Sequence, residues 1–313
     1  MRVAAFYRFA RFSSEEIEPL RARLLALGRD HGVLGTVLLA EEGVNGTISG
    51  PEAGVDTVLA HLRRDPRLAD LAIRRSSSDR QPFFRLKVKR KREIVSLGIA
   101  GADPLERVGA YVPPAGWNAL VRDPRTLLID TRNSYEVEVG TFPGAIHPGS
   151  HCFRDFPTWV ERELPALLAA RQPERLALFC TGGIRCEKAT AHLLGQGFSG
   201  VHHLQGGILG YLEATPPEQS LWQGECFVFD QRAALNHQLL PGSHALCHAC
   251  RMPLSEADRQ LPSYIPGVGC RHCDGHRSPV DRNRYAERQR QQQRAMGVGE
   301  RHLGRSFPLT GAP

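Results

Sequence analysis

The sequence predicts an α/β protein in three parts: an α+β domain over residues 1–100, a doubly wound parallel sheet over residues 123–217, and a small Cys-rich segment over residues 218–313. Three observations predict this division. Strand and helix patterns alternate through the first hundred residues, short apolar strands alternate with helices in the middle, and two CxxC pairs follow Pro216-Pro217. Residues 101–122 begin with a Gly- and Pro-containing stretch and are expected to be a linker.

The first domain is expected to begin with a strand over Val3–Phe9. Ser13 and Glu16 then have the spacing of a capping box, and apolar residues recur at helical spacing after them. Two further apolar runs, Gly35–Ala40 and Thr47–Ser49, predict a pair of strands. The domain therefore starts with a strand, a helix and a hairpin.

The rest of the first domain completes a familiar order of elements. Asn45-Gly46 supplies the positive φ angles of a tight turn between the paired strands. Pro51 marks the start of a second helix, and Phe84–Leu97 is expected to be the final strand. The order β-α-β-β-α-β predicts a ferredoxin-like, that is acylphosphatase-like, split fold.

The middle domain shows short apolar strands at Thr126–Ile129, Leu176–Phe179 and Val201–Leu204, with helical spacing at Ala189–Leu194 between the last two. Strands of this kind that alternate with helices indicate a parallel sheet, in which active residues follow the carboxyl ends of the strands.

Composition narrows the class of protein. The chain has a formal net charge of +7 and a pI near 9.2, which favours polyanionic partners. No apolar stretch approaches the roughly 20 residues of a membrane span, and the apolar N-terminus is broken by Arg8 and Arg11 with no cleavage site after it. Eight cysteines are too few for a disulfide scaffold. We therefore expect reduced thiols, a cytoplasmic location and no membrane partner.

Cys180 ends the strand Leu176–Phe179 and begins a loop that enters a helix. The loop residues are Thr181, Gly182, Gly183, Ile184 and Arg185. Glycines let backbone N–H groups converge on one point, and a helix N-terminus and an arginine add positive charge. Cysteines in such settings have pKa values lowered to roughly 3.5–7.5. The pattern predicts a nucleophilic thiolate, or equally a persulfide, with Cys180 and Arg185 as the catalytic pair.

Two nearby features have both a functional and a structural interpretation. Cys186 would resolve an oxidised or persulfidated Cys180 if their Cα atoms lie within about 7 Å, or it is a small residue packed beneath the helix. Asp130 and Arg132 favour an internal ion pair that holds a strand to its loop, because buried charges are normally paired.

The C-terminal segment holds two CxxC pairs, Cys247 with Cys250 and Cys270 with Cys273. Four thiolates at this spacing are typical of a structural Zn²⁺ site. The alternative is four free or redox-active thiols.

Basic residues gather on the expected final strand of the first domain. They are Lys87, Lys89, Arg90, Lys91 and Arg92. The three lysines alternate and therefore share one face, near Phe83 and Phe84, which favours an RNA-binding surface. The alternative is an edge strand that lysines protect from aggregation. The Arg- and Gln-rich residues 282–305 predict a solvated helix that fades into a disordered tail and adds a second basic surface.

Several motifs together resemble the rhodanese domain. They are Leu128–Arg132, Gly140–Ile146, the Cys180 loop and Leu204–Gly207, in that order. The resemblance implies a rhodanese-like fold and a persulfide on the catalytic cysteine. Four residues separate Cys180 from Arg185, which is one fewer than in the related dual-specificity phosphatases, so a phosphatase is disfavoured.

The resemblance extends to a more specific family. Val33–Thr47, Cys180–Lys188 and the paired CxxC segment are similar to the bacterial oxygen-dependent tRNA uridine(34) hydroxylases. This implies an oxidoreductase that forms 5-hydroxyuridine at the wobble position, with molecular oxygen as co-substrate and the tRNA anticodon arm as partner. The sequence shows no flavin or haem motif, and it leaves open whether Cys180 attacks uracil C6 or carries oxygen or sulfur.

Two other functions remain open at this point. The first is a sulfurtransferase that passes sulfane sulfur from Cys180 to an acceptor. The second is a non-catalytic adaptor that binds zinc and RNA, although the intact Cys180 loop argues against it.

Overall fold

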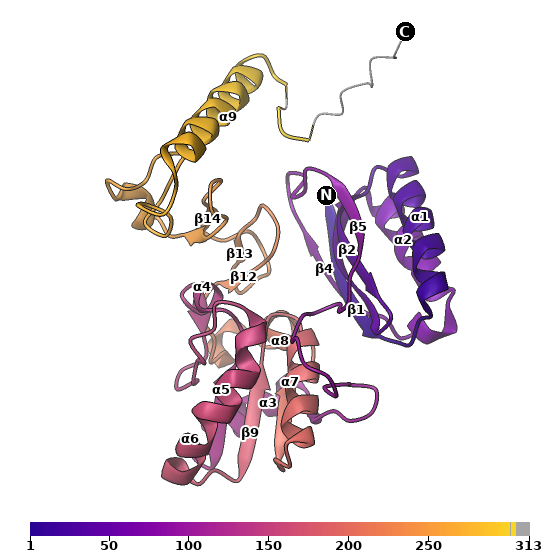
Figure 1. The fold of residues 1–313 in the computed structure, drawn as a ribbon, viewed down its shortest axis with the longest axis vertical. Helices are drawn as coiled ribbons and strands as arrows, with labels where there is room; N and C mark the ends of the chain where they lie inside the picture. Colours follow the sequence, from indigo (N-terminus) through magenta and orange to yellow (C-terminus); the bar gives the residue numbers. More distant parts are fainter. Residues whose placement is uncertain (301, 305–313) are drawn as a thin grey trace.

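The computed structural model describes residues 1–300 and 302–304, and it contains the three expected parts (Figure 1). The elements of the first domain are β1 (Arg2–Phe9), α1 (Ser14–Asp30), β2 (Leu34–Ala40), β3 (Gly43–Gly50), α2 (Glu52–Arg63), a 3-10 turn at Pro66–Leu68, β4 (Ala72–Ser77) and β5 (Leu86–Arg90). They form one sheet in the order β4-β1-β3-β2-β5. The strand order through β2 is the split fold predicted from the sequence.

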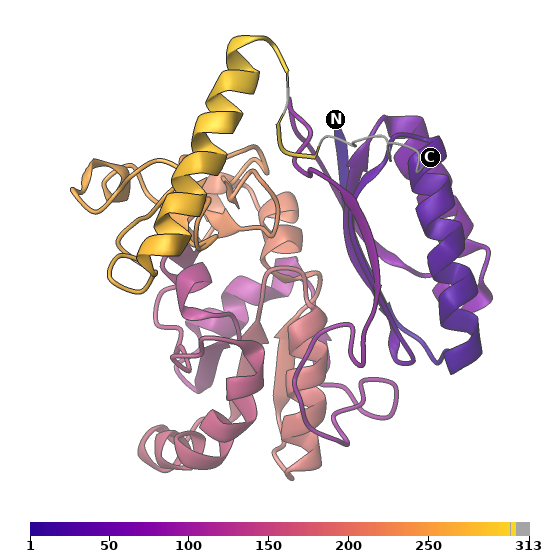
Figure 2. The same ribbon diagram turned by 45° about the horizontal axis from the view of Figure 1, so that its top comes forward.

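Helices α1 and α2 cover only one face of this sheet, and the other face turns toward the rest of the molecule (Figures 1 and 2). The apolar core lies on the helix side, where Phe6, Val37 and Ile48 pack against Leu24 and Leu59. The predicted capping box is confirmed, because the Ser13 N–H donates to the Glu16 carboxylate at 2.7 Å and the Ser13 side chain accepts in return. The sheet therefore presents one unpacked face to the second domain.

Two details of the predicted first domain were wrong. The final strand of the split fold is β4, whereas Phe84–Leu97 contributes only the additional edge strand β5, which runs parallel to β2. β4 could not be predicted from the sequence because it is an edge strand with one large apolar residue, Ile73. The hairpin turn is also misplaced: Asn45-Gly46 lies within β3, and the turn falls at Glu41-Glu42.

The second domain is built around a parallel sheet in the order β6-β10-β9-β7. Its elements are β6 (Ala110–Val112), α3 (Pro114–Arg122), β7 (Thr126–Asp130), α4 (Ser134–Val137), β8 (Gly140–Thr141), a 3-10 turn at Phe153–Asp155, α5 (Phe156–Arg162), α6 (Leu164–Arg171), β9 (Arg175–Phe179), α7 (Ile184–Gly195), β10 (Val201–Leu204) and α8 (Gly207–Ala214). Apolar clusters line both faces of the sheet, as expected for a doubly wound fold.

The expected linker over residues 101–122 was wrong in its second half. β6 pairs with β10 and is a strand of the parallel sheet, and α3 buries Trp117 completely in the core of the same domain. A three-residue strand is too short to show periodicity, and the prolines that flank it suggested a linker.

The C-terminal segment contains short paired strands and one long helix. Its elements are a 3-10 turn at Pro217–Gln219, β11 (Gln223–Gly224), β12 (Cys226–Phe227), β13 (Ala234–Leu235), β14 (Ala245–Leu246), β15 (Pro253–Leu254), a 3-10 turn at Asp258–Gln260 and α9 (Pro279–Gly297). β11 pairs with β8 of the second domain. Helix α9 buries no residue, as predicted for a solvated helix, and it ends at Gly297. Much of the predicted disordered tail lies outside the described residues. Within the part of the chain that the structure describes, each helix is too short or too polar to cross a membrane.

Candidate active site

Cys180 lies at the carboxyl end of β9, and the loop after it brings backbone N–H groups around the thiol. The Gly183 N–H donates to Cys180 Sγ at 3.1 Å, and Gly183 is the N-cap residue just before α7, with φ at +104°. An added Cβ at Gly183 would also lie 2.7 Å from Tyr7 Oη of the first domain. The loop shape therefore requires glycine at this position, for its backbone conformation and for the close approach of β1.

Arg185 forms an ion pair that the sequence did not indicate. Its Nη1 and Nη2 donate to the two carboxylate oxygens of Glu136, each at 2.7 Å, and both side chains are buried. Nη2 also contacts Thr181 Oγ1 at 3.3 Å. Burial opposes ionisation of Glu136, but Arg185 outweighs it and lowers the pKa of that carboxyl. The charge beside Cys180 is thus a bidentate ion pair, which fixes the guanidinium in place.

The thiol of Cys180 ionises more readily than an ordinary cysteine. Burial raises its pKa, but the Cys186 thiol, the Arg185 guanidinium and the N–H groups of Cys186 and Gly183 outweigh burial and bring the pKa to about 6. Burial and the neighbouring Cys180 raise the pKa of Cys186, so one thiol of the pair holds the proton. Cys186 also contacts Thr131 Oγ1 at 3.7 Å. The structure brings these two cysteines together beneath the loop.

Cys180 has no surface exposed to bulk solvent, but it borders a cleft of about 1160 Å³ between the first domain, the Cys180 loop and the C-terminal segment. The open face of the first sheet forms one wall. Basic side chains outnumber acidic ones around it; the basic ones are Arg8, Arg74, Arg75, Lys91, Arg154, Arg185 and Arg232. Most of these cations are paired with carboxylates, for example Arg74 with Glu213 and Arg75 with Asp56, so the cleft that borders the thiol is lined by ion pairs and apolar side chains as well as by Lys91 and Arg154.

Sequence reasoning missed a cluster of proton-bearing groups beside Cys180. Tyr7 Oη donates to Glu187 Oε1 at 2.7 Å, and Tyr111 of β6 forms a second hydrogen bond to Glu187. Burial raises the pKa of Glu187 against these hydrogen bonds. Tyr7 belongs to β1 and Glu187 to α7, so nothing in the local sequence of either residue could have indicated the contact.

Lys188 joins the first domain to the helix that follows the Cys180 loop. Its ammonium group lies 2.7 Å from Glu42 Oε2 and 2.5 Å from Glu93 Oε2, and it also donates to the Val95 carbonyl at 3.2 Å. The residue is buried, with 3% of its surface exposed. Because a buried ammonium group needs such partners, this contact fixes α7 against the first domain.

The predicted basic strand lies at the edge of the cleft. Val88 packs into the helix-side core, so Lys87 and Lys89 project from the open face, where they are exposed beside Thr36 and Leu38 of the cleft wall. Lys91 continues the alternation and lines the cleft itself, and Arg92 is exposed.

Arg90 was grouped with these cations, but it lies on the helix side of the strand. It hydrogen-bonds Ser14 at the start of α1, and its guanidinium is 3.9 Å from Glu41. The alternation of a strand explains this difference.

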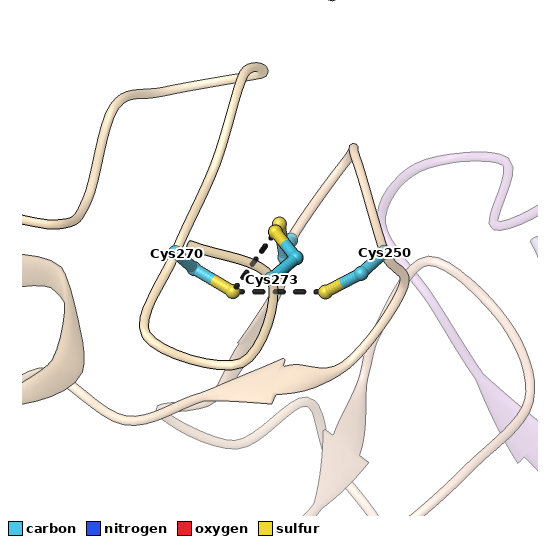
Figure 3. Close-up of side chains that lie close together, drawn as sticks. Cys250, Cys270 and Cys273 are labelled. Atoms are coloured by element: carbon cyan, nitrogen blue, oxygen red, sulfur yellow. Dashed lines mark hydrogen bonds between the residues drawn. The ribbon is translucent and has the colours of Figure 1, made fainter. Parts of the chain in front are cut away.

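The four cysteines of the CxxC pairs come together in the C-terminal segment, and Figure 3 shows three of them, Cys250, Cys270 and Cys273. All four Sγ atoms lie within 4.8 Å of one another. Cys250 Sγ and Cys270 Sγ are 3.6 Å apart, and Cys270 Sγ and Cys273 Sγ are 3.8 Å apart. A tetrahedral Zn²⁺ with four Zn–S bonds requires sulfur atoms about 3.8 Å apart, so the residues present fit this ion.

Asp130 and Arg132 form the predicted internal ion pair. Arg132 Nη2 lies 2.6 Å from Asp130 Oδ2, and neither side chain is exposed. Arg132 also donates to the Gly140 carbonyl at 2.6 Å, so the pair ties the end of β7 to β8.

Known proteins share this arrangement of domains. Residues 1–94 match the family model described as UPF0176 acylphosphatase like domain, and residues 115–214 match the Rhodanese-like domain model. A tRNA uridine(34) hydroxylase of Synechococcus sp. (strain CC9605) is 57% identical over 92% of this chain and 90% of its own length. The chain belongs to the tRNA uridine(34) hydroxylase family.

Other members of the tRNA uridine(34) hydroxylase family are nearly as similar. The protein so named in Parasynechococcus marenigrum (strain WH8102) is 55% identical over 92% of both chains. The one in Mesorhizobium japonicum (strain LMG 29417 / CECT 9101 / MAFF 303099) is 51% identical over 97% of both chains. The predicted family, the fold class and the rhodanese-like middle domain are confirmed.

Proposed function

We propose that this chain hydroxylates uridine 34 of tRNA to 5-hydroxyuridine, with molecular oxygen as co-substrate. Membership of the hydroxylase family over nearly the full chain supports this reaction. The observation that carries the proposal is the position of Cys180, an easily ionised thiol that borders a cleft large enough for a nucleotide. In the cell this chemistry belongs in the cytoplasm, where tRNA is present and thiols stay reduced.

The cleft suits a nucleotide that leaves a single-stranded loop. Its volume of about 1160 Å³ holds a pyrimidine nucleotide with room for its neighbours, and a wobble base already outside a duplex costs little to unstack. Lys87, Lys89, Lys91 and Arg92 would contact phosphates of the anticodon arm, which supply most of the affinity in such complexes. Arg90 is left out of this surface because it pairs on the opposite face.

Cys180 supplies the reactive sulfur in this proposal. As a thiolate it can add to C6 of uracil, which raises the electron density at C5, the carbon that is hydroxylated. As a persulfide or sulfenate it would instead carry sulfur or oxygen. Arg185 holds the loop through Glu136. Cys186, whose thiol neighbours that of Cys180, would close a disulfide with an oxidised Cys180 if their Cα atoms come within about 7 Å.

The four-cysteine cluster would hold a structural Zn²⁺. The ion would tie the two CxxC loops together in a segment too small to be stabilised by its own apolar core. Metal analysis of the purified chain tests this: one zinc ion per chain is expected, and Cys273→Ser should lose it and unfold at a lower temperature. Four reduced thiols and no bound metal in freshly purified protein would contradict the zinc site.

A sulfurtransferase is the second candidate, because the Cys180 cradle lies in a domain that matches the rhodanese model. The products separate the two functions. tRNA from a deletion strain should lack 5-hydroxyuridine, which the wild-type gene should restore and a Cys180→Ser gene should not. Unchanged 5-hydroxyuridine in the deletion strain, or a thiolated nucleoside as the product of the purified chain, would refute the hydroxylase.

A further inference from the structure

Phe229 projects into the cleft from the C-terminal segment. Its side chain is 61% exposed, the highest value for a Phe, Tyr or Trp among the residues that the structure describes. It lies in the loop between β12 and β13, beyond the residues that either family model matches. Sequence reasoning gave this residue no role.

The loop that carries Phe229 is fixed on both sides. Within it, the Val228 N–H donates to the Ala233 carbonyl at 2.9 Å. Its tip docks on the first domain, where the Gln231 N–H donates to the Pro82 carbonyl at 3.1 Å and Arg232 Nη1 donates to Ser76 Oγ at 2.8 Å. Arg232 is held in turn by Asp230 at 2.6 Å. The exposed ring is therefore presented by an ordered, docked loop.

Two contacts hold the Phe229 ring, one with Phe227 and one with Arg185 of the Cys180 loop. Phe227 packs edge-to-face against it, with ring centroids 5.2 Å apart and ring planes at 90°. The Arg185 guanidinium carbon lies 5.9 Å from the Phe229 centroid, and Arg185 is the residue that closes the loop around Cys180. One part of the ring thus contacts protein, and the rest borders the space that leads to the reactive sulfur.

We infer that Phe229 is a stacking platform for the base of nucleotide 34, which places that base over the Cys180 loop. This inference rests on the proposed function. Proteins that bind single-stranded RNA stack unpaired bases on aromatic side chains, and a pre-fixed ring loses little conformational entropy when a base binds. The three parts of the chain then each contribute to one site: the first domain supplies the open face of its sheet, the second the thiol, and the C-terminal segment the platform.

A contribution to stability alone is the competing interpretation, because Phe229 packs on Phe227. The two differ in what they require of the RNA. A stacking platform acts only when a base is present at position 34, whereas a structural residue affects every RNA equally.

Binding to two RNAs separates these interpretations. The full-length Cys180→Ala chain, which cannot turn over, is titrated with an anticodon stem-loop that has uridine at position 34 and with the same stem-loop lacking that base. Phe229→Ala should weaken binding of the uridine RNA by about 5- to 100-fold and change binding of the abasic RNA by less than about twofold. Phe229→Tyr should retain tight binding, and Phe229→Leu, apolar but without an aromatic face, should not.

Equal weakening for both RNAs, or no weakening for either, would overturn the inference. The urea midpoint of each variant shows whether the loop still folds. If Phe229→Ala does not fold, the comparison of Phe229→Tyr with Phe229→Leu still tests the inference. A different pair of results would show that the proposed function itself is wrong. In that case the chain with Cys180 intact would form no 5-hydroxyuridine, and the Cys180→Ala chain would bind the two RNAs equally well. If 5-hydroxyuridine forms but Phe229→Ala affects binding of the two RNAs equally, the stacking role of Phe229 is refuted and the proposed function is not.

Discussion

Replacing Gly183 with alanine tests whether contact with the first domain shapes the Cys180 loop. Gly183 has φ at +104°, and an added Cβ would lie 2.7 Å from Tyr7 Oη, far inside contact distance. Gly182, the neighbouring glycine, has no atom within 4 Å of the corresponding position. Gly182→Ala is therefore a matched control with the same added methyl group.

The expected effect has two parts. An L-residue in a sparsely populated backbone conformation costs about 1–3 kcal/mol, and an overpacked methyl group costs about 1–3 kcal/mol more. Gly183→Ala should therefore lower the free energy of unfolding by about 2–6 kcal/mol, whereas Gly182→Ala should change it by less than about 0.5 kcal/mol. Activity should fall with Gly183→Ala as well, because the Gly183 N–H that contacts Cys180 Sγ would move.

Urea denaturation of the single and double variants provides the assay. Tyr7→Phe removes the hydroxyl that the new methyl group would meet, so the double variant Gly183→Ala with Tyr7→Phe should be more stable than the sum of the single effects predicts, by about 0.5–3 kcal/mol. Strict additivity would show that Tyr7 does not approach the loop in solution. A Gly183→Ala chain as stable as Gly182→Ala would refute the backbone reasoning as well.

Three further predictions concern charge. Lys87→Ala and Lys89→Ala should each weaken tRNA binding and reduce the salt slope of log affinity by about 1. Arg23, an exposed residue of α1 on the opposite side of the sheet, is the control, and Arg23→Ala should do neither. Equal effects of the three substitutions would contradict the RNA surface. Iodoacetamide should react with Cys180 at a rate that rises with pH and reaches a plateau above the pKa of about 6, because the thiolate is the reactive form. A rate that keeps rising up to pH 9.0, the ordinary pKa of a thiol, would contradict this. The lowered pKa of Cys180 in the folded chain also makes stability depend on pH. Ionisation of Cys180 stabilises the folded chain fully above the pKa that this thiol has in the unfolded chain, and the contribution is lost as the pH falls through the folded pKa. Lys188→Met should lower the free energy of unfolding by about 3–5 kcal/mol, because two carboxylates lose their partner. A urea midpoint equal to that of the wild type would show that the stability of the chain does not depend on this contact between the domains.

The sequence indicated those parts of the site that depend on neighbours along the chain. Cys180 and its glycines are adjacent residues between a strand and a helix, and each CxxC pair spans a single turn. Ser13 and Glu16 likewise form a local cap. In such motifs the spacing itself fixes the geometry, so the pattern is visible without a structure.

The parts that the sequence did not indicate depend on contacts between distant segments. Tyr7 meets Glu187 across 180 residues, and Glu136 pairs with Arg185 across 49. Phe229 gains its position from docking on the first domain. Strand β4 was missed because an edge strand that borders a cleft needs little apolar alternation.

Isotope labelling tests the central claim most directly, that Cys180 supports oxygenation of uridine 34. The purified chain is incubated with unmodified tRNA and a chemical reductant under dioxygen labelled with a heavy oxygen isotope, because the oxygen atom that is not transferred must be reduced to water. The nucleoside at position 34 is then analysed by mass spectrometry. Labelled 5-hydroxyuridine is expected with the wild-type chain and none with Cys180→Ser. Formation of the labelled nucleoside by the Cys180→Ser chain, or a hydroxyl oxygen that comes from water, would contradict the account.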